Sequence, residues 1–438
     1  MKVQIKKILI IFALVVLSLP IIVFFPNHGT GDMDIWLEWT SHIDRWGPLN
    51  AYSIINTDII DTNIHGAPIN NINTNHSYWT SDYPPITFIN LWLAKKTAEV
   101  FGVSWMIGIK IMLLVYFLAT WVSLIYLSTL FRRRSIWISI TVASLLFLGG
   151  LYFAVISQAF TTLDITYAPY VVFSLALFTR RNYLLSGMCF ALAVLVKWIA
   201  IMMLPVFLFY FIIKKGRRFK IDTPIFKFLG SMTLVFCLLI IGFWLNHLSL
   251  LSLAESLRKA SSHGVWYFEI GALNFVYLIQ YGVIKPFYPE TYGMIIKNNL
   301  HIFSSISAVI FLLVFIAILK SFLKRKKDIG NLLEASLMIS WSYFIWRTGV
   351  HANHLFITVL GALCLVIINT SKSNVRQYLW LSFFGLSTVF THGFPVRGGF
   401  VTFPVNTLHL GLVAAFHVFI YLVYLRSYLQ FQPRGTKN

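Results

Sequence analysis

Charged residues are scarce in this sequence. Asp, Glu, Lys and Arg make up 11% of its 438 residues, whereas soluble domains carry roughly 25%. So few charges cannot cover a water-facing surface, which excludes a soluble protein of two or three domains. Cysteine is scarce too, and the three cysteines, Cys189, Cys237 and Cys364, lie inside apolar stretches. That placement is typical of small buried side chains and excludes a disulfide framework or a cysteine metal site.

Motifs for nucleotides and for zinc are also missing. The sequence contains no G-x-G-x-x-G after a strand, no Walker A sequence and no HExxH, so nucleotide binding and a structural zinc have no support. The net charge of +20 would suggest a nucleic-acid partner for a soluble protein. Here the basic residues cluster between apolar stretches, as the positive-inside rule predicts for cytoplasmic loops. We therefore expect no nucleic-acid partner.

Apolar residues dominate the chain. Hydrophobic residues make up 58% of the sequence, and apolar stretches of about 20 residues, the length that crosses a bilayer as a helix, recur almost to the C-terminus. A transmembrane barrel would instead alternate polar and apolar residues in stretches of about ten. The sequence therefore predicts an all-α polytopic protein of the cell membrane.

Basic clusters mark the points at which the chain folds back at the cytoplasmic face. If all of them lie inside, both termini are cytoplasmic and the chain crosses the membrane about 12 times. The predicted spans are 5–25, 104–130, 135–156, 165–179, 183–197, 199–213, 226–246, 301–319, 332–350, 355–370, 377–391 and 405–425. Residues 85–101 are apolar but contain Lys95, Lys96 and Glu99, and we expect an amphipathic helix at the outer interface there.

Three long segments, 27–84, 247–300 and 392–404, project at the outer face in this topology. We expect a module over 1–246 that includes the first of them, and a C-terminal module over 247–438 that carries the other two. Seven of the 15 acidic residues fall in the first segment: Asp32, Asp34, Glu38, Asp44, Asp58, Asp61 and Asp82. Any chemistry is therefore expected on the extracytoplasmic side.

The first candidate site is Asp32 and Asp34, just beyond the first predicted span. A carboxylate there could act as general base on a hydroxyl, or the pair could hold a divalent cation through oxygen ligands. A structural interpretation is equally open, because either aspartate could cap a helix that starts at Ile35.

The second candidate is the sequence Asp82-Tyr83-Pro84-Pro85. The two prolines force an extended entry into the helix that follows, and Pro85 suits its first turn. Asp82 precedes the positive end of that helix, so helix capping alone also accounts for it.

Polar residues at the outer ends of apolar spans form the third group: Asp164, Lys197, Arg347, His351 and His354. Ionisable residues near the membrane are costly and are functional candidates by default. Snorkelling to the lipid headgroups is the alternative for Lys197 and Arg347. An arginine and two histidines within eight residues favour an anion site.

An outer carboxylate cluster together with outer cations suits displacement of a phosphate leaving group on a membrane-embedded lipid. The carboxylate would deprotonate an incoming hydroxyl, and Arg, Lys or His would stabilise the charge that grows on the departing phosphate. Glycosyl transfer from a polyprenyl-phosphate sugar fits this chemistry, and its lipid carrier removes the need for a nucleotide-binding domain.

These motifs resemble the GT-C superfamily of lipid-phosphate-dependent glycosyltransferases. GDMDIWLEW at 31–39 and DYPPI at 82–86 are similar to the G-D-[YF]-E and D-Y-P-P-L motifs of the dolichyl-phosphate-glucose-dependent glucosyltransferases of the N-glycan pathway, and VHAN at 350–353 echoes their V-H-E-K motif. Asp164 resembles an outer acidic residue that many members carry. The resemblance implies a GT-C-type bundle of helices with a long outer loop.

The resemblance also implies residue roles. Asp32 would be the catalytic base and His351 a phosphate contact, although Ala352 and Asn353 replace the acidic and basic residues of the family motif. We expect an inverting hexosyltransferase without a cofactor, with a cation at Asp32 and Asp34 as the minority alternative. Its partners would be a polyprenyl-phosphate-linked sugar donor and a lipid-linked or polymeric glycan acceptor. Substrate contacts are expected from Asp34, Asp82, Tyr83, Asp164, Lys197, Arg347, His351 and His354.

Three other classes stay open from the sequence. A flippase or carrier of lipid-linked saccharides would share the topology, but it would more often place polar residues in the middle of spans. A cell-envelope polysaccharide polymerase or ligase would more often have an arginine-rich outer loop, whereas residues 247–300 contain a single arginine, Arg258. A structural subunit of an envelope complex would not need the outer acidic cluster.

Overall fold

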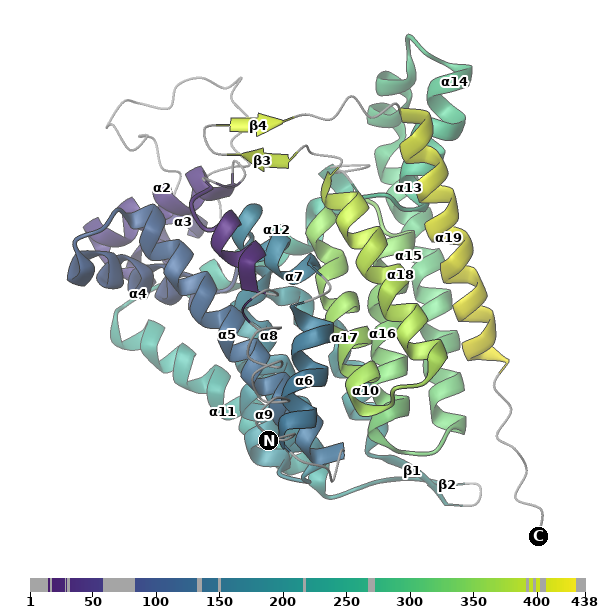
Figure 1. Cartoon of the computed structure of the whole chain (residues 1–438), viewed down its shortest axis with the longest axis horizontal. Coiled ribbons are helices and arrows are strands. Elements are labelled where there is room, and N and C mark those ends of the chain that lie inside the picture. The colour runs from purple at the N-terminus through teal and green to yellow at the C-terminus, as the bar shows by residue number, and fades with distance from the viewer. Residues whose placement is uncertain are drawn as a thin grey trace, which may run out of the picture. The chain divides into compact units, whose positions relative to one another are not determined.

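The computed structural model describes residues 15, 18–27, 29, 32–57, 83–131, 136–148, 151–215, 218–266, 272–390, 394–396, 399–401 and 407–430. Helices make up nearly all of this part of the chain (Figure 1). The exceptions are two small two-stranded sheets, β1 (Ile212–Lys215) with β2 (Arg218–Ile221) and β3 (Phe394–Val396) with β4 (Gly399–Val401). The all-α prediction is therefore confirmed at the level of fold class.

The chain forms two compact units. The first comprises residues 1–200, 226–261 and 395–400, and the second comprises residues 201–225, 262–394 and 401–438. The first unit contains α2 (Asp32–Trp46), α3 (Pro48–Thr57), α4 (Pro85–Phe101), α5 (Trp105–Phe131), α6 (Ile136–Phe147), α7 (Tyr152–Ala154), the π-helix η2 (Val155–Ala159), the 3-10 helix η3 (Leu163–Thr166), α8 (Ala168–Thr179), α9 (Tyr183–Val196), and most of α11 (Pro224–Leu245) and α12 (Leu251–Trp266). The 3-10 helix η4 (Trp198–Met203) begins in this unit.

Helix α5 is the central packing element of the first unit. It packs against α4, α6 and α8, and α8 packs in turn against α9 (Figure 1). The approach of α4 to α5 is close, because a Cβ at Gly108 would lie 2.4 Å from the carbonyl oxygen of Ala94. Only glycine lets the two helix backbones come this near to each other.

The helix predicted at 85–101 is present as α4. Pro85 lies in its first turn, and Gly102 closes it in a left-handed conformation with φ 61°, as the N-terminal proline and C-terminal glycine preferences of helices predict. Whether this helix lies at the outer interface stays a prediction.

Helix α2 is attached to α4 by an ion-pair cluster. Lys95 is buried, forms ion pairs with Asp44 and Glu99, and lies over the ring of Trp105. Burial alone would lower the pKa of Lys95, but its hydrogen bonds to the two carboxylates outweigh burial and raise that pKa. Lys96 adds an ion pair of 2.7 Å to Glu99. The cluster fixes the helix that carries Asp32 against the rest of the unit.

The predicted span 135–156 is broken. Helix α6 and the segment Tyr152–Ala159 differ in direction by 64°, and Leu151 and Thr161 adopt positive φ values of 57° and 56°. Between these two residues the chain forms η2, and after Thr161 it forms η3 before α8 begins. The irregular segment 151–166 therefore separates two apolar helices.

The second unit is also helical. Its elements are α10 (Leu204–Tyr210), α13 (Phe275–Tyr277), the π-helix η5 (Leu278–Ile284), α14 (Lys285–Phe287), α15 (Tyr292–Lys324), α16 (Ile329–Trp346), the 3-10 helix η6 (Ala352–Leu355), α17 (Phe356–Ile368), α18 (Lys372–Phe390) and α19 (Thr407–Leu429). Helices α15 to α18 pack in chain order, each against the next. His417 of α19 lies buried in this unit, where it accepts a hydrogen bond of 2.9 Å from Trp341 Nε1 of α16.

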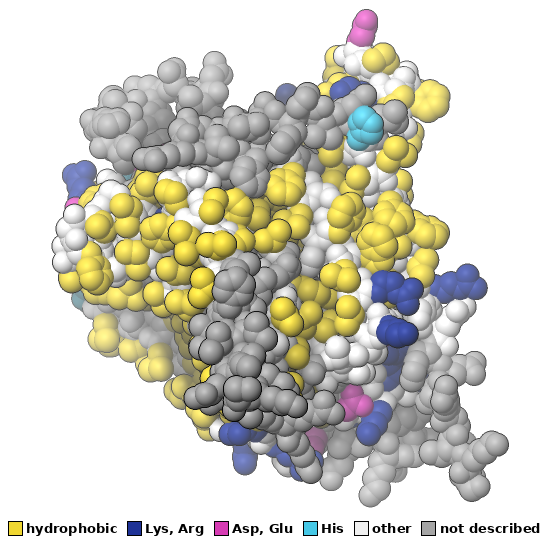
Figure 2. Space-filling view, viewed as in Figure 1, with side chains coloured by type: hydrophobic (Ala, Val, Ile, Leu, Met, Phe, Trp, Pro, Cys, Tyr) yellow, Lys and Arg dark blue, Asp and Glu magenta, His cyan; other side chains and the backbone are white. Residues whose placement is uncertain are grey.

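Several described helices suit a membrane. Four are long and apolar enough to cross one, namely α5, α11, α15 and residues His409–Leu429 of α19, and the bent pair of α6 with Tyr152–Ala159 makes a fifth if it is one span. Hydrophobic side chains cover much of the described surface in Figure 2, with few charged groups among them. Both observations support a membrane protein.

The prediction of about 12 crossings is not confirmed. The predicted spans 165–179, 183–197, 199–213 and 355–370 correspond to apolar helices of 17 residues or fewer, which is shorter than the roughly 20 residues that a straight crossing needs. Most of the first predicted span, 5–25, lies outside the described residues.

The close packing of α4 on α5 predicts a difference between two glycines of the first unit. Gly108→Leu should lower the midpoint of thermal unfolding in detergent, because overpacking costs about 1–3 kcal/mol. Gly230→Leu is the matched control, since a Cβ at Gly230 meets nothing within 4 Å. Tryptophan fluorescence during heating measures both midpoints. Equal losses in the two variants would contradict the role assigned to the close contact.

Candidate functional site

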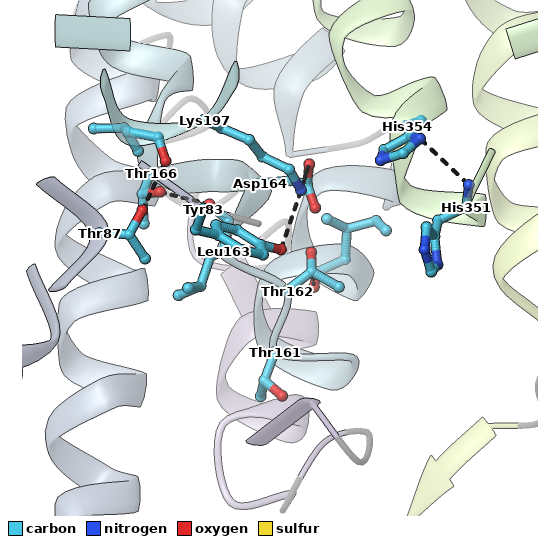
Figure 3. Close-up of polar contacts among 12 residues, drawn as sticks. Tyr83, Thr87, Thr161, Thr162, Leu163, Asp164, Thr166, Lys197, His351 and His354 are labelled. Atoms are coloured by element: carbon cyan, nitrogen blue, oxygen red, sulfur yellow. Dashed lines mark hydrogen bonds and ion pairs between the residues drawn. The ribbon is translucent and has the colours of Figure 1, made fainter. Parts of the chain in front are cut away.

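The centre of the candidate site is a buried ion pair in the first unit. Lys197 Nζ lies 2.7 Å from Asp164 Oδ1 (Figure 3), and the two side chains are 9% and 0% exposed. The same ammonium lies 5.0 Å from the centroid of the Tyr83 ring and 3.4 Å from its hydroxyl. The structure thus brings together three of the residues that the sequence singled out separately.

Lys197 is positioned by the end of α9. The helix stops at Val196, and Lys197 adopts an extended conformation with φ −150° and ψ 123°. Thr87, in the first turn of α4, donates a hydrogen bond of 2.7 Å to the carbonyl oxygen of Val196. This contact satisfies a carbonyl at the end of α9 that no intrahelical donor reaches. It also fixes the start of α4, which begins two residues after Tyr83.

Tyr83 is held from a second direction. Ser256 of α12 donates a hydrogen bond of 2.9 Å to the carbonyl oxygen of Tyr83 and accepts one of 3.3 Å from Trp198 Nε1. Because Trp198 follows Lys197 in the chain, this serine connects the side chain of the residue after Lys197 to the backbone of Tyr83.

Asp164 is positioned by the turn that precedes η3. Trp36 Nε1 of α2 donates a hydrogen bond of 3.3 Å to the carbonyl oxygen of Thr161. Gly29 approaches the same threonine so closely that a Cβ there would lie 2.0 Å from Thr161 Oγ1. Gly29 also has a φ of 98°, so both the space and the backbone conformation require glycine. The segment that opens the acidic loop therefore contacts the turn that carries Asp164.

The surroundings of Asp164 remain partly unsatisfied. Its Oδ2 atom and both side-chain polar atoms of Gln158 are buried without a hydrogen-bond partner in the described part of the chain. The buried phenols of Tyr152 and Tyr167 lie close enough to interact with the Asp164 charge. Buried polar atoms in native structures normally have partners, and those that lack one are often functional.

Snorkelling does not describe Lys197, because its ammonium is buried and paired with Asp164 rather than extended toward headgroups. The ammonium of Lys197 lies next to an aromatic ring, and both the Asp164 carboxylate and the face of the Tyr83 ring stabilise its charge. An incoming anion could share that ammonium with Asp164.

The two aspartates at the start of α2 lie in its first turn. The helix starts at Asp32, three residues before the start at Ile35 that the capping interpretation assumed. Asp34 is exposed and Asp32 is partly buried. Asp32 precedes Trp36 by four residues, so both lie on the same face of α2. Trp36 contacts Thr161, so Asp32 rather than Asp34 shares a helix face with the residue that contacts the turn before Asp164.

A divalent cation held by both aspartates has little geometric support, because residues two apart on a helix do not face each other. No group of three or more His, Cys, Asp or Glu side chains that could hold a metal ion occurs among the described residues. Asp82 lies outside the described residues.

The second unit contains the other three candidate residues. Arg347 follows the end of α16, and its Nη1 lies 3.3 Å from the Ser304 carbonyl oxygen and 3.4 Å from Ser307 Oγ, both on α15. His351 caps η6, and its backbone N–H donates a hydrogen bond of 3.3 Å to His354 Nδ1 (Figure 3). The two histidines thus have a local structural role that the anion interpretation did not include.

Lys110 and Ser256 are polar residues near this site that the sequence interpretation missed. Lys110 is 1% exposed and donates a hydrogen bond to the carbonyl oxygen of Gln158. It is the only charged residue in the sequence of α5, and a lone charge inside an apolar span is a signal that could have identified it. Ser256 carries no such signal, because its role depends on contacts with distant segments.

The chain matches no protein-family model, and a comparison with curated proteins finds no match. The family suggested by the motifs at 31–39 and 82–86 therefore stays a prediction.

The buried pair predicts strong coupling between its members. Lys197→Met should destabilise the protein by about 3–5 kcal/mol, because it leaves the Asp164 charge buried without a counter-charge. Adding Asp164→Asn to that variant should restore much of the loss. A double-mutant cycle, followed by unfolding in mixed micelles with increasing SDS, measures the coupling.

The exposed pair Arg258 and Glu255 is the matched control for this cycle, with side chains 61% and 32% exposed. Exposed pairs contribute about 0–1 kcal/mol, so Arg258→Met and Glu255→Gln should show little coupling. Coupling of the Asp164–Lys197 pair no larger than that of this control would show that the pair is not a buried ion pair in the folded protein.

Proposed function

We propose that this protein is an inverting glycosyltransferase with a GT-C-type fold of about 12 transmembrane helices. It transfers a hexose from a polyprenyl-phosphate carrier to an acceptor hydroxyl on the extracytoplasmic side of the membrane. The observation that carries the proposal is the buried Asp164–Lys197 pair beside Tyr83, next to a turn that α2 contacts through Trp36.

In the proposed reaction the acceptor oxygen attacks the anomeric carbon of the donor sugar from the side opposite the phosphate. The bond between that carbon and the phosphate oxygen breaks, and the lipid phosphate leaves with the bonding electrons. The hydroxyl proton passes to Asp32, which lies in the first turn of α2. No nucleotide is needed, because the lipid carrier holds the donor in the membrane.

The cations have the second role. A growing negative charge on the leaving phosphate is best stabilised by donors that are already oriented before the reaction. Lys197 meets this requirement, since Asp164 and Tyr83 hold its ammonium in place. Arg347 and His351 of the second unit are proposed as further phosphate contacts. Asp34, Asp82, Tyr83 and His354 are proposed to contact the sugar or the acceptor.

A carrier of lipid-linked saccharides is the second candidate function, and one observation favours it. Transporters bind their substrates where helices are interrupted, and the segment 151–166 is an interruption next to a buried charge pair. The transferase is preferred because a carrier needs no carboxylate base, whereas Asp32 lies in the first turn of α2.

Asp32 is tested by replacement with a shape-matched neutral residue. Asp32→Asn should bind donor normally and lose transfer by at least about 100-fold, because general-base catalysis contributes roughly 100- to 10,000-fold. The measurement is transfer of labelled sugar from synthetic polyprenyl-phosphate hexoses into a lipid or polymer fraction by membranes that contain each variant, with and without a chelator.

Glu255→Gln is the control for Asp32→Asn, because Glu255 pairs with Arg258 within α12 and has no proposed role. It should retain wild-type transfer. Normal turnover of Asp32→Asn would move the base elsewhere, with Asp34 next in line. No transfer by the wild type from any donor, together with movement of lipid-linked sugar across vesicles, would establish the carrier function instead.

His351 is tested by separating its capping role from its proposed phosphate contact. His351→Asn can still cap η6 but lacks the imidazole, so the unfolding midpoint should stay near the wild type while the KM for the lipid-linked donor rises about tenfold. His351→Ala should lose both properties. Transfer rates measured over a range of donor concentrations distinguish the two. A wild-type KM in His351→Asn would remove His351 from the donor site.

A further inference from the structure

Lys110 is a buried cation that the proposed reaction does not use. It lies in the second turn of α5, is 1% exposed and is the only charged residue of that helix. No carboxylate pairs with it in the described part of the chain, and its ammonium has one hydrogen-bond acceptor there, the carbonyl oxygen of Gln158. Burying a cation without a carboxylate partner between helices costs free energy, so a packing role alone does not explain Lys110.

The acceptor of this hydrogen bond belongs to the end of a helix. Gln158 lies in η2, where Phe160 N–H bonds to the Val155 carbonyl oxygen at 3.0 Å and Thr162 N–H bonds to that of Ile156 at 3.1 Å. Carbonyl groups in the last turn of a helix lack intrahelical donors. Inside a membrane no water replaces those donors. Lys110 supplies the missing donor, and its charge also complements the negative end of the helix.

The chain that follows Gln158 leads directly to the ion pair. Thr161 has a positive φ of 56°, Thr162 is extended with φ −78° and ψ 143°, and η3 then carries Asp164. The turn is held on its other side by the hydrogen bond from Trp36 to Thr161. The two contacts, one from α5 and one from α2, enclose the strained residue, and strained backbone persists only where its surroundings enforce it.

We propose that Lys110 is a positioning residue. Its ammonium anchors the carbonyl oxygen of Gln158, and this anchor sets the turn that places Asp164, which in turn holds Lys197. The inference rests on the proposed transfer only for its catalytic consequence. Lys110 itself touches no substrate in this scheme.

The structural part is tested by hydrogen exchange on the purified full chain in detergent, without donor or acceptor. In Lys110→Met the amides of residues 155–166 should exchange about tenfold faster or more, because the turn opens locally, while amides in α9 keep their wild-type rates. Lys110→Arg, which keeps a cationic donor, should restore slow exchange. If Lys110→Met does not accumulate, Lys110→Gln takes its place.

Lys327→Met is the matched control, since Lys327 also donates a hydrogen bond to a backbone carbonyl oxygen, that of Phe209 at 3.2 Å, but lies in the second unit. It should leave exchange in 155–166 unchanged. Wild-type exchange in Lys110→Met or Lys110→Gln, or equal acceleration in Lys327→Met, would overturn the inference.

The catalytic part is tested by transfer from labelled polyprenyl-phosphate glucose, or from the hexose that the wild type uses. Lys110→Met should lower kcat by about 10- to 100-fold, as small misplacements of reacting groups do, with little change in the donor KM, and Lys110→Arg should recover most of it. Faster exchange with a wild-type kcat would overturn the positioning role. Absence of transfer by the wild type would overturn the proposed function, and the exchange experiment would still decide whether Lys110 anchors the turn.

Discussion

The ion pair between Asp164 and Lys197 is the interaction on which the geometry of the first unit depends. Two charges removed from water are stable only if their geometry is good and their remaining polar atoms are occupied. The ammonium of Lys197 contacts the carboxylate of Asp164 and the ring face and hydroxyl of Tyr83. Asp164 lies in η3, within the interruption between α6 and α8, and from there its carboxylate reaches Lys197 at the end of α9. The chain thus gives up regular helix between α6 and α8 where it brings the pair together.

An interrupted helix leaves backbone groups that need partners, and the sequence supplies them from two sources. Nearby hydroxyls donate hydrogen bonds to some of the carbonyl oxygens: Ser157 donates to that of Phe153, and Thr166 donates to that of Leu163. Side chains from more distant segments donate to others: Lys110 donates to the carbonyl oxygen of Gln158, and Trp36 donates to that of Thr161. Irregular backbone at membrane depth is tolerated only when it is satisfied in this way. The polar residues around the site therefore stabilise its irregular backbone as well as its charges.

The extent to which the sequence predicted this arrangement follows from the range of the interactions involved. Helix α4 was predictable because Pro85 and Gly102 mark its ends locally. Asp164 and Lys197 were identifiable singly as charges at the ends of apolar stretches, but no local pattern indicates that they pair. The break in 135–156 had Gly149-Gly150 as its one local signal. The π-helix and 3-10 helix that follow contain neither glycine nor proline, so only tertiary contacts specify them. The predicted count of spans is not confirmed because of these short and broken helices.

The structural role of the histidines in the second unit is compatible with the binding role proposed for them. His354 Nδ1 accepts a hydrogen bond from the His351 backbone, so that nitrogen carries no proton. In the neutral imidazole the proton then resides on Nε2, which is a donor. The cap thereby selects the His354 tautomer whose other nitrogen can donate to an oxygen of the sugar or the acceptor, the contact proposed for this residue. Capping of η6 does not compete with the contact proposed for His354, because the cap orients the His354 ring and leaves the proton on the nitrogen that would donate to the sugar or the acceptor.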